Sequence, residues 1–390
     1  MLYVVRLVFI LLHRSEWPCL SFDILKDNLG VGRQQFPMTA YMVAGTQAPV
    51  GEANKLMLIK MSELHKTQKD EASDSEDESD EEGNEDPVME VRYIPHTGCI
   101  NRVRAMPQQS NIIASWSDTG SVNVFNVSKQ LSTLVKPDSA SLASTNTTSP
   151  SAPIYSFSGH PEEGFAMDWS KTVTGRFITG DCKKHIYVWE PNEGTGSWAV
   201  DKVPFTGHSA SVEDLQWSPV EATVFSSCSA DGTVKIWDTR TKKKSMLSVE
   251  AHDSDVNVIS WNPNVAYLMI SGSDDGTFKI WDLRSFDSKS FVANYKWHTA
   301  PITSVEWHPT DESVLAVSGA DNQLTLWDLA LEADDGPTDT EIDASIPPQL
   351  LFIHQGQEDI KELHFHPQMP GVIMSTALDG FNIFKPDVTE

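Results

Sequence analysis

One short motif recurs three times in the second half of the chain, and its spacing limits what the chain can fold into. The copies read SADGTVKIWDTR at residues 229–240, SDDGTFKIWDLR at 273–284 and GADNQLTLWDLA at 319–330. In each copy a histidine precedes the aspartate by 23 residues and the tryptophan by 29 residues. The three sets are His208, Asp231 and Trp237; His252, Asp275 and Trp281; and His298, Asp321 and Trp327. Because both separations hold in every copy, they indicate one repeated structural unit.

The repeated unit has the features of a small β-sheet. Apolar and β-branched runs such as KIW and LTLW lie beside Asp-Gly or Asp-Asn turns, and no helical period separates them. Repeats of this length with Gly-His and Trp-Asp pairs are typical of a WD-repeat β-propeller, in which each blade buries one face on the next. Because the histidines and aspartates recur in every copy, we interpret them as buried partners in a hydrogen-bonded turn, not as catalytic pairs.

Less regular copies bring the number of blades to seven. A copy with His160 and Trp189 keeps the separation of 29 residues. Two more copies, 96–127 and 354–384, carry a phenylalanine in the tryptophan position. Strand-like runs in 37–62 supply one further blade. We therefore predict an all-β fold, a seven-bladed WD-repeat β-propeller with acidic insertions.

The propeller is predicted to occupy residues 16–386 and to be closed by a strand from its N-terminal region. The last blade has only three candidate strands of its own. In residues 19–25 apolar and polar side chains alternate, so we expect this segment to supply the missing outer strand. Residues 1–15 are an atypical apolar segment, too short to span a bilayer. We interpret them as an amphipathic or buried segment or as an incorrect start in the gene model, and expect their loss to be mild.

Composition limits the class of partner. The chain has 55 acidic and 29 basic residues, a net charge of −26, so direct nucleic-acid binding through a basic face is not expected and basic proteins are the natural partners. The four cysteines are scattered, without the spacing of a zinc site or a disulfide framework. We expect no cofactor and no membrane partner. No nucleophile, phosphate-loop or metal motif supports an enzyme.

Three insertions interrupt the predicted ring. Residues 66–87 form a charged tract that we expect to be disordered; Asp70–Asp86 alone contains eleven acids and no base. Within it Ser73, Ser75 and Ser79 each have a glutamate three residues later, the preference of an acid-directed kinase. The alternative is that the tract is only a solvated linker. Residues 128–153 are rich in Ser, Thr and Pro and are expected to be a loose loop.

The third insertion, residues 332–349, is the candidate partner-binding loop. It has six acids, no base and a double proline, which stiffens the returning arm and lowers the entropy lost on binding. Its clustered carboxylates would attract a lysine- and arginine-rich client. The residues assigned to this site are Glu332, Asp334, Asp335, Asp339, Glu341, Asp343, Pro347 and Pro348.

The chain resembles a known family in several stretches. EWPCLSFDIL (16–25) and IPPQLLFIH (346–354) resemble the histone-binding propellers of the retinoblastoma-binding class. AGTQA (44–48), GHPEEGFAMDWS (159–170) and HSASVEDLQWSP (208–219) resemble the glutamate-rich WD-repeat protein family more closely. That resemblance implies a nuclear and nucleolar protein that escorts a basic ribosomal protein in large-subunit biogenesis, works with ribosome-assembly factors and binds core histones. Residues 1–14 match neither group.

A second function class rests on two shorter motifs. WDTR (237–240) and WDLR (281–284) resemble the W-D-x-R motif of substrate receptors for a cullin–RING ubiquitin ligase adaptor. By that resemblance Arg240 and Arg284 would be the docking side chains. The alternative is that an arginine after the Trp-Asp pair caps the end of a strand.

Overall fold

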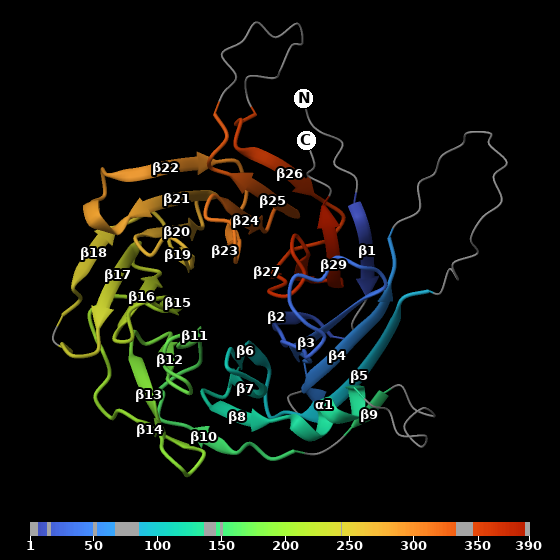
Figure 1. Ribbon diagram of the computed structural model, residues 1–390. Helices are drawn as coiled ribbons and strands as arrows, with labels where there is room; N and C mark the ends of the chain where they lie inside the picture. The colour runs from blue at the N-terminus through green and yellow to red at the C-terminus, as the bar shows by residue number, and fades with distance from the viewer. Residues whose placement is uncertain are drawn as a thin grey trace, which may run out of the picture.

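The computed structural model describes residues 7–13, 17–49, 53–66, 86–135, 146–148, 151–242, 244–332 and 346–386. Seven β-sheets are arranged as blades around a central channel (Figure 1), which confirms the seven-bladed propeller. Neighbouring strands within each blade are antiparallel apart from one added strand in the first blade. Within the described ranges no helix has the length and apolarity needed to cross a membrane.

The blades follow one another in chain order, and within each blade the strands are named from the innermost outward. Blade 1 consists of β2 (Cys19–Ile24), β3 (Met38–Thr46), β4 (Lys55–Leu64), β5 (Val88–Pro95) and the added β9 (Asn146–Thr148). Blade 2 consists of β6 (Ile100–Met106), β7 (Gln109–Ser117), β8 (Val122–Asn126) and β10 (Tyr155–Phe157). Blade 3 consists of β11 (Gly164–Trp169), β12 (Phe177–Asp181), β13 (Ile186–Asn192) and β14 (Ser197–Val200).

The next three blades contain the regular repeats, and the last blade contains both ends of the described chain. Blade 4 consists of β15 (Val212–Trp217), β16 (Val224–Ser229), β17 (Thr233–Asp238) and β18 (Leu247–Glu250). Blade 5 consists of β19 (Val256–Trp261), β20 (Leu268–Ser273), β21 (Thr277–Asp282) and β22 (Phe291–Lys296). Blade 6 consists of β23 (Ile302–Trp307), β24 (Val314–Gly319), β25 (Gln323–Asp328) and β26 (Leu350–His354). Blade 7 consists of β27 (Glu362–Phe365), β28 (Ile373–Ala377), β29 (Gly380–Pro386) and β1 (Leu7–His13).

The core lies between the blades rather than within them. One cluster, for example, joins Ile178 and Val188 of blade 3 to Val212, Trp217 and Trp237 of blade 4, all of them buried. Burying one such side chain stabilises the fold by roughly 1.5–3 kcal/mol. The Asp-Gly turn of blade 4 fits against the next repeat so closely that a Cβ on Gly232 would lie 2.8 Å from the carbonyl oxygen of His252.

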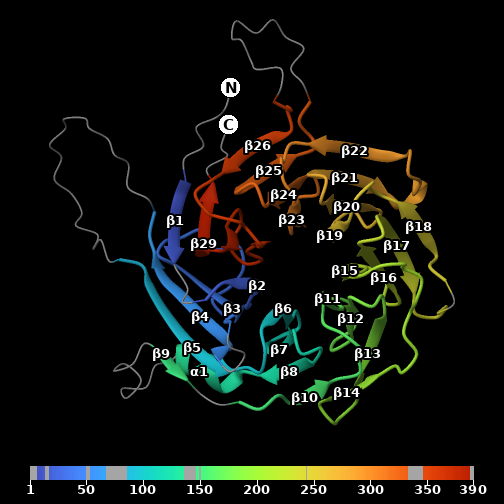
Figure 2. The same cartoon turned by 180° about the vertical axis from the view of Figure 1, so that it is seen from behind.

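The ring is not closed by the strand that the sequence suggested. β1 pairs antiparallel with β29, from Leu7 opposite Pro386 to His13 opposite Phe381, and is therefore the outer strand of blade 7. The two strands lie side by side from both directions (Figures 1 and 2). Residues 19–24, which we predicted to occupy that place, are instead the innermost strand of blade 1. The prediction was wrong because alternation of apolar and polar residues identifies a half-buried strand but not its position in the blade.

The segment 128–153 also differs from the loose loop that we expected. It begins with helix α1 (Ser128–Val135), in which Leu134 is buried against the core between blades 1 and 2. It then supplies β9, which pairs in parallel with β5. A short helix in a Ser- and Thr-rich stretch carries too little periodicity to be recognised from sequence.

Candidate protein-interaction site

The repeated histidines, aspartates and tryptophans are brought together inside their blades. In blade 4, Nδ1 of His208 lies 3.0 Å from Oδ2 of Asp231, and Nε2 lies 2.7 Å from Oγ of Ser227. The indole N–H of Trp237 donates to the same hydroxyl oxygen at 2.8 Å. This chain of polar contacts joins the surface turn to the middle of the blade, as expected of a structural network.

Blades 5 and 6 repeat this arrangement with small changes. Nδ1 of His298 lies 2.9 Å from Oδ1 of Asp321. In blade 5 the corresponding atoms of His252 and Asp275 are 3.5 Å apart, and Nε2 of His252 lies 2.8 Å from the hydroxyl of Ser271, which accepts from Trp281. Blade 6 uses a threonine hydroxyl in place of the serine to accept from Trp327.

The protonation states of these pairs suit a structural role. Burial lowers the pKa of His208, and it lowers the pKa of His252 to about 4, so both rings are neutral at pH 7. Burial alone would raise the pKa of Asp231, but hydrogen bonds from His208 and Thr233 outweigh it and hold the pKa well below its usual value. Since the histidine side chains are fully buried, they are not placed to meet a substrate.

Blade 3 keeps the network although its sequence is irregular. Asp181 lies only 21 residues after His160, yet its Oδ2 is 2.8 Å from Nδ1 of the ring. The hydroxyl of Thr179 lies 2.8 Å from Nε2 and accepts from the indole of Trp189. The pairing therefore tolerates a shift of two residues in the turn.

A second set of polar contacts, which the sequence did not reveal, stitches neighbouring blades together around the channel. In each case a carboxylate on the innermost strand of one blade accepts a hydrogen bond from a backbone N–H of the innermost strand of the next. The pairs are Asp23 with Ala105, Asp168 with Trp217, Asp214 with Ile259, Glu306 with Phe365 and Glu362 with Phe22. An alternating pattern with an acid on the inner strand was the only signal in the sequence.

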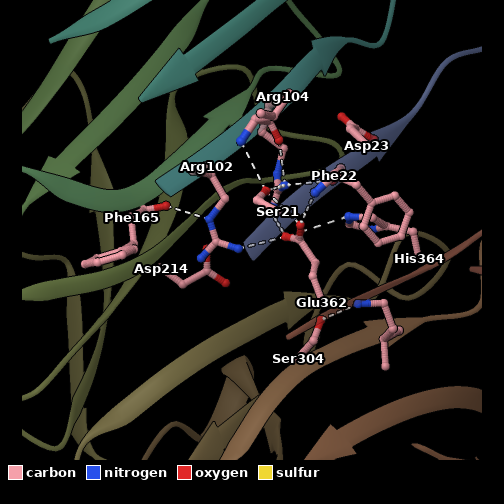
Figure 3. Close-up of polar contacts among 12 residues, drawn as sticks. Ser21, Phe22, Asp23, Arg102, Arg104, Phe165, Asp214, Ser304, Glu362 and His364 are labelled. Atoms are coloured by element: carbon pink, nitrogen blue, oxygen red, sulfur yellow. Dashed lines mark hydrogen bonds and ion pairs between the residues drawn. The ribbon is translucent and has the colours of Figure 1, made fainter. Parts of the chain in front are cut away.

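Glu362 is the centre of the densest of these contacts (Figure 3). Its Oε1 accepts from Arg102 and Arg104, each at 2.7 Å, and its Oε2 accepts from the hydroxyl of Ser21 and the N–H of Phe22, each at 2.8 Å. Burial alone would raise the pKa of Glu362, but the two guanidinium groups and His364 outweigh it and hold the pKa far below its usual value. One side chain of blade 7 thus binds blades 1 and 2 across the closure of the ring.

The channel contains a cavity of about 550 Å³ lined by the innermost strands of all seven blades. Burial raises the pKa of the Asp168 carboxyl in its wall to about 7. Asp23, Asp214, Glu306 and Glu362 also line this wall, and all four accept hydrogen bonds between blades. Among the described residues, no group of three or more His, Cys, Asp or Glu side chains is arranged to hold a metal ion.

Arg240 and Arg284 are exposed but held in place. They follow the third strands of blades 4 and 5, and their side chains are 70% and 65% exposed. The Nε atoms of Arg240 and Arg284 each donate at 2.9 Å to the aspartate two residues earlier, Asp238 and Asp282. The Arg284 guanidinium also lies 3.7 Å from the centre of the Tyr267 ring. The geometry is compatible with a fixed docking pair and with a local cap at the end of each strand.

Only the two ends of the acidic loop fall within the described residues. Glu332 is exposed at its start, and Pro347 and Pro348 lie at its return. The side chain of Gln349 donates to the carbonyl of Leu331 at 2.8 Å and closes the base of the loop. Asp334, Asp335, Asp339, Glu341 and Asp343 lie outside the described residues, as do Ser73, Ser75 and Ser79.

Comparisons with known proteins extend over nearly the whole chain. It is 45% identical to Ribosome assembly protein rrb1 of Schizosaccharomyces pombe, over 97% of the chain and 80% of the relative. It is 49% identical to Glutamate-rich WD repeat-containing protein 1 of Dictyostelium discoideum, over 96% of the chain and 79% of the relative. The chain belongs to the glutamate-rich WD repeat-containing protein family. It is also 50% identical to Protein HEAT STRESS TOLERANT DWD 1 of Arabidopsis thaliana, over 95% of the chain and 84% of the relative.

Membership of the glutamate-rich WD repeat family, predicted from the quoted stretches, is thus confirmed. A family model for the histone-binding protein RBBP4 and its counterpart in the CAF1 complex matches residues 8–65, which include β1 and the first three strands of blade 1. A model described as Nucleolar protein 10-like, N-terminal domain, matches residues 160–375. The crystal structure of the WD40 propeller domain of Doa1 shares the fold, with a TM-score of 0.63 and 15% identity over 98% of this chain and 97% of that one.

Proposed function

We propose that this propeller acts without catalysis in large ribosomal subunit biogenesis, as an escort of a basic ribosomal protein, and that it also binds core histones. The observation that carries the proposal is the similarity to Ribosome assembly protein rrb1 over 97% of the chain. The match of residues 8–65 to a histone-binding family model supports the second client. On the same basis we place the protein in the nucleus and nucleolus, with ribosome-assembly factors as further partners.

Charge and geometry support a protein partner. A net charge of −26 favours basic clients and opposes direct binding to nucleic acid. The conspicuous histidine–aspartate pairs are buried in structural networks, so the proposal needs no cofactor, no membrane and no catalytic step. We assign the client site to residues 332–349, whose base is closed by Gln349 and continues into β26.

The client site is tested by neutralising its charge. Changing Glu332, Asp334, Asp335, Asp339, Glu341 and Asp343 to Gln or Asn should weaken binding of purified core histones and flatten its dependence on salt. The matched control neutralises six acids in Asp70–Asp86. If the control weakens binding as much, total charge explains the binding and the loop is not a dedicated site. Affinity purification with mass spectrometry should recover a basic large-subunit ribosomal protein and assembly factors; their absence would contradict the escort role.

A second candidate function is recruitment to a cullin–RING ubiquitin ligase. The observation that favours it is the exposed and fixed placement of Arg240 and Arg284 at the same position of consecutive blades. Replacing both by alanine should then abolish co-purification of the ligase adaptor, whereas replacing Lys242 and Lys289 should not. If the adaptor is never recovered with the wild-type protein, the arginines serve only as caps of their strands.

A further inference from the structure

Blade 1 has an additional strand on its outer edge. The sheet β2–β3–β4–β5 is extended by β9, whereas the other six sheets have four strands each within the described ranges. The pairing is parallel and runs through Val91 with Asn146, Arg92 with Thr147 and Tyr93 with Thr148. Since β9 belongs to the insertion between β8 and β10 of blade 2, the chain leaves blade 2, pairs with blade 1 and returns (Figure 1).

Helix α1 directs the insertion toward this edge. Arg92 of β5 donates from Nε to the hydroxyl of Thr133 and from its terminal nitrogen to the carbonyl of Thr133, each at 3.2 Å. Leu134 is fully buried among residues of blades 1 and 2. The insertion is therefore anchored beside β5 before it supplies β9.

The added strand leaves much of the edge uncovered. β5 spans eight residues, and β9 pairs with only three of them. The stretch from Val88 to Glu90 has no outer partner strand in the part of the chain that the structure describes. Val88 is 44% exposed. An open edge presents backbone N–H and C=O groups to any extended segment that can pair with them.

The charge near this edge indicates what kind of segment would fit. Val88 follows directly after the tract 70–86, which contains eleven acids and no base. In a parallel pairing, the N-terminal part of an added strand lies beside the N-terminal part of β5 and thus toward these acids. Basic residues that precede the pairing stretch of a partner would therefore lie on the acidic side.

We propose that the outer edge of blade 1 binds an extended segment of the basic client as an added parallel strand, lysine- and arginine-rich at its N-terminal side, in place of β9. This inference rests on the proposed function, since it names the contact by which a basic client is held. β9 covers the edge when the client is absent, which protects an exposed strand from non-specific pairing.

The test uses the full chain and two short labelled peptides of identical composition. One has its Lys and Arg residues before a Val- and Thr-rich stretch, and the other has the two halves in reverse order. Thr147→Pro removes a backbone donor from β9, while Ser141→Pro makes the same change outside the paired residues. We expect Thr147→Pro to tighten binding of the first peptide about fivefold, since it weakens a competing set of backbone hydrogen bonds, and Ser141→Pro to change nothing.

Hydrogen exchange locates the contact. Amides of β5 should exchange faster in Thr147→Pro than in the wild type and regain protection when the first peptide is added. Equal affinity for the two peptides, or no protection of β5 on binding, would overturn the proposal. If these tests fail while intact core histones still bind both variants like the wild type, the escort function stands and only the assignment of the edge is lost.

Discussion

At the scale of single residues, Glu362 should contribute more to stability than any exposed ion pair. Glu362→Gln would leave Arg102 and Arg104 without their shared carboxylate, and removing one partner of a buried pair costs about 3–5 kcal/mol. Because the two arginines are 15% and 17% exposed, we expect the lower end of that range. The measurement is urea unfolding at pH 7.

A matched control exists in blade 3. Glu190→Gln breaks the pair with Arg176, in which the glutamate is 47% exposed, and should cost less than about 1 kcal/mol. Because the folded-state pKa of Glu362 is lowered, its contribution is present above the ordinary pKa of 4.5 and is lost as the pH falls below it. A Glu362→Gln variant that is as stable as the wild type at pH 7 would contradict this account.

His366 should make stability depend on pH in a mildly acidic range. Its Nδ1 accepts from the backbone N–H groups of Gln368 and Met369, each at 3.1 Å, so the ring must stay neutral at that atom. Burial lowers its pKa to about 3, whereas the ordinary value is 6.5. Stability is therefore full above pH 6.5 and falls as the pH drops toward 3, by about 1.4 kcal/mol for each pH unit.

Blade 5 supplies the replacement that tests this. Asn262 occupies the corresponding place and accepts from Asn264 and Val265 through its side-chain oxygen at 2.9 and 2.8 Å. His366→Asn should therefore keep the two hydrogen bonds and remove the titration. Thermal melts between pH 7 and pH 4 should show a smaller loss in the variant, and an unchanged slope would assign the pH dependence to other groups.

At the scale of elements, the strand β1 should be required for a stable last blade. Deleting residues 1–13 removes the outer partner of β29 along six paired positions. We expect a clearly lower melting temperature and faster hydrogen exchange in residues 380–386, because β29 becomes an open edge. If a fragment that starts at residue 14 melts like the full chain, the closure by β1 contributes nothing measurable.

Phosphorylation of Ser73, Ser75 or Ser79 should act on binding and not on folding. Each phosphate adds negative charge to the acidic tract, so a basic client should bind more tightly at low salt. The melting temperature should stay the same because the connected strands β4 and β5 already pair along eight positions. Unchanged affinity after modification confirmed by mass spectrometry would reduce the tract to a solvated linker.

Sequence reasoning located most elements but misplaced one. The constant distances from His208, His252 and His298 to their tryptophans predicted the number and order of the blades, because every copy must solve the same packing problem. The same logic failed for residues 19–25, since alternation does not distinguish an inner from an outer strand. The cluster around Glu362 was missed because Arg102 and Ser21 come from other blades and meet only in the closed ring.

At the scale of the whole molecule, the order of the blades along the chain should matter less than their completeness. Leu7 and Pro386 are opposite each other in the pair β1–β29, so a short linker can join them. New ends in the exposed turn 193–196, between β13 and β14, should give a folded permutant with a similar melt. New ends beside Asp181 should not, because they would break the His160 network; equal melts for both permutants would contradict this.

The pairing of β1 with β29 also sets a timetable for synthesis. Residues 7–13 are made before the other strands, and their partner strand, 380–386, is made after them all. The hydrogen bond from Phe22 to Glu362 spans a separation of 340 residues in the same way. While the ribosome is still translating, the first strand of this protein therefore waits with an unpaired apolar edge, and the final blade can form only after release. A protein that we propose protects a newly made client thus passes through an unprotected state of its own, in which nascent-chain chaperones have most to do.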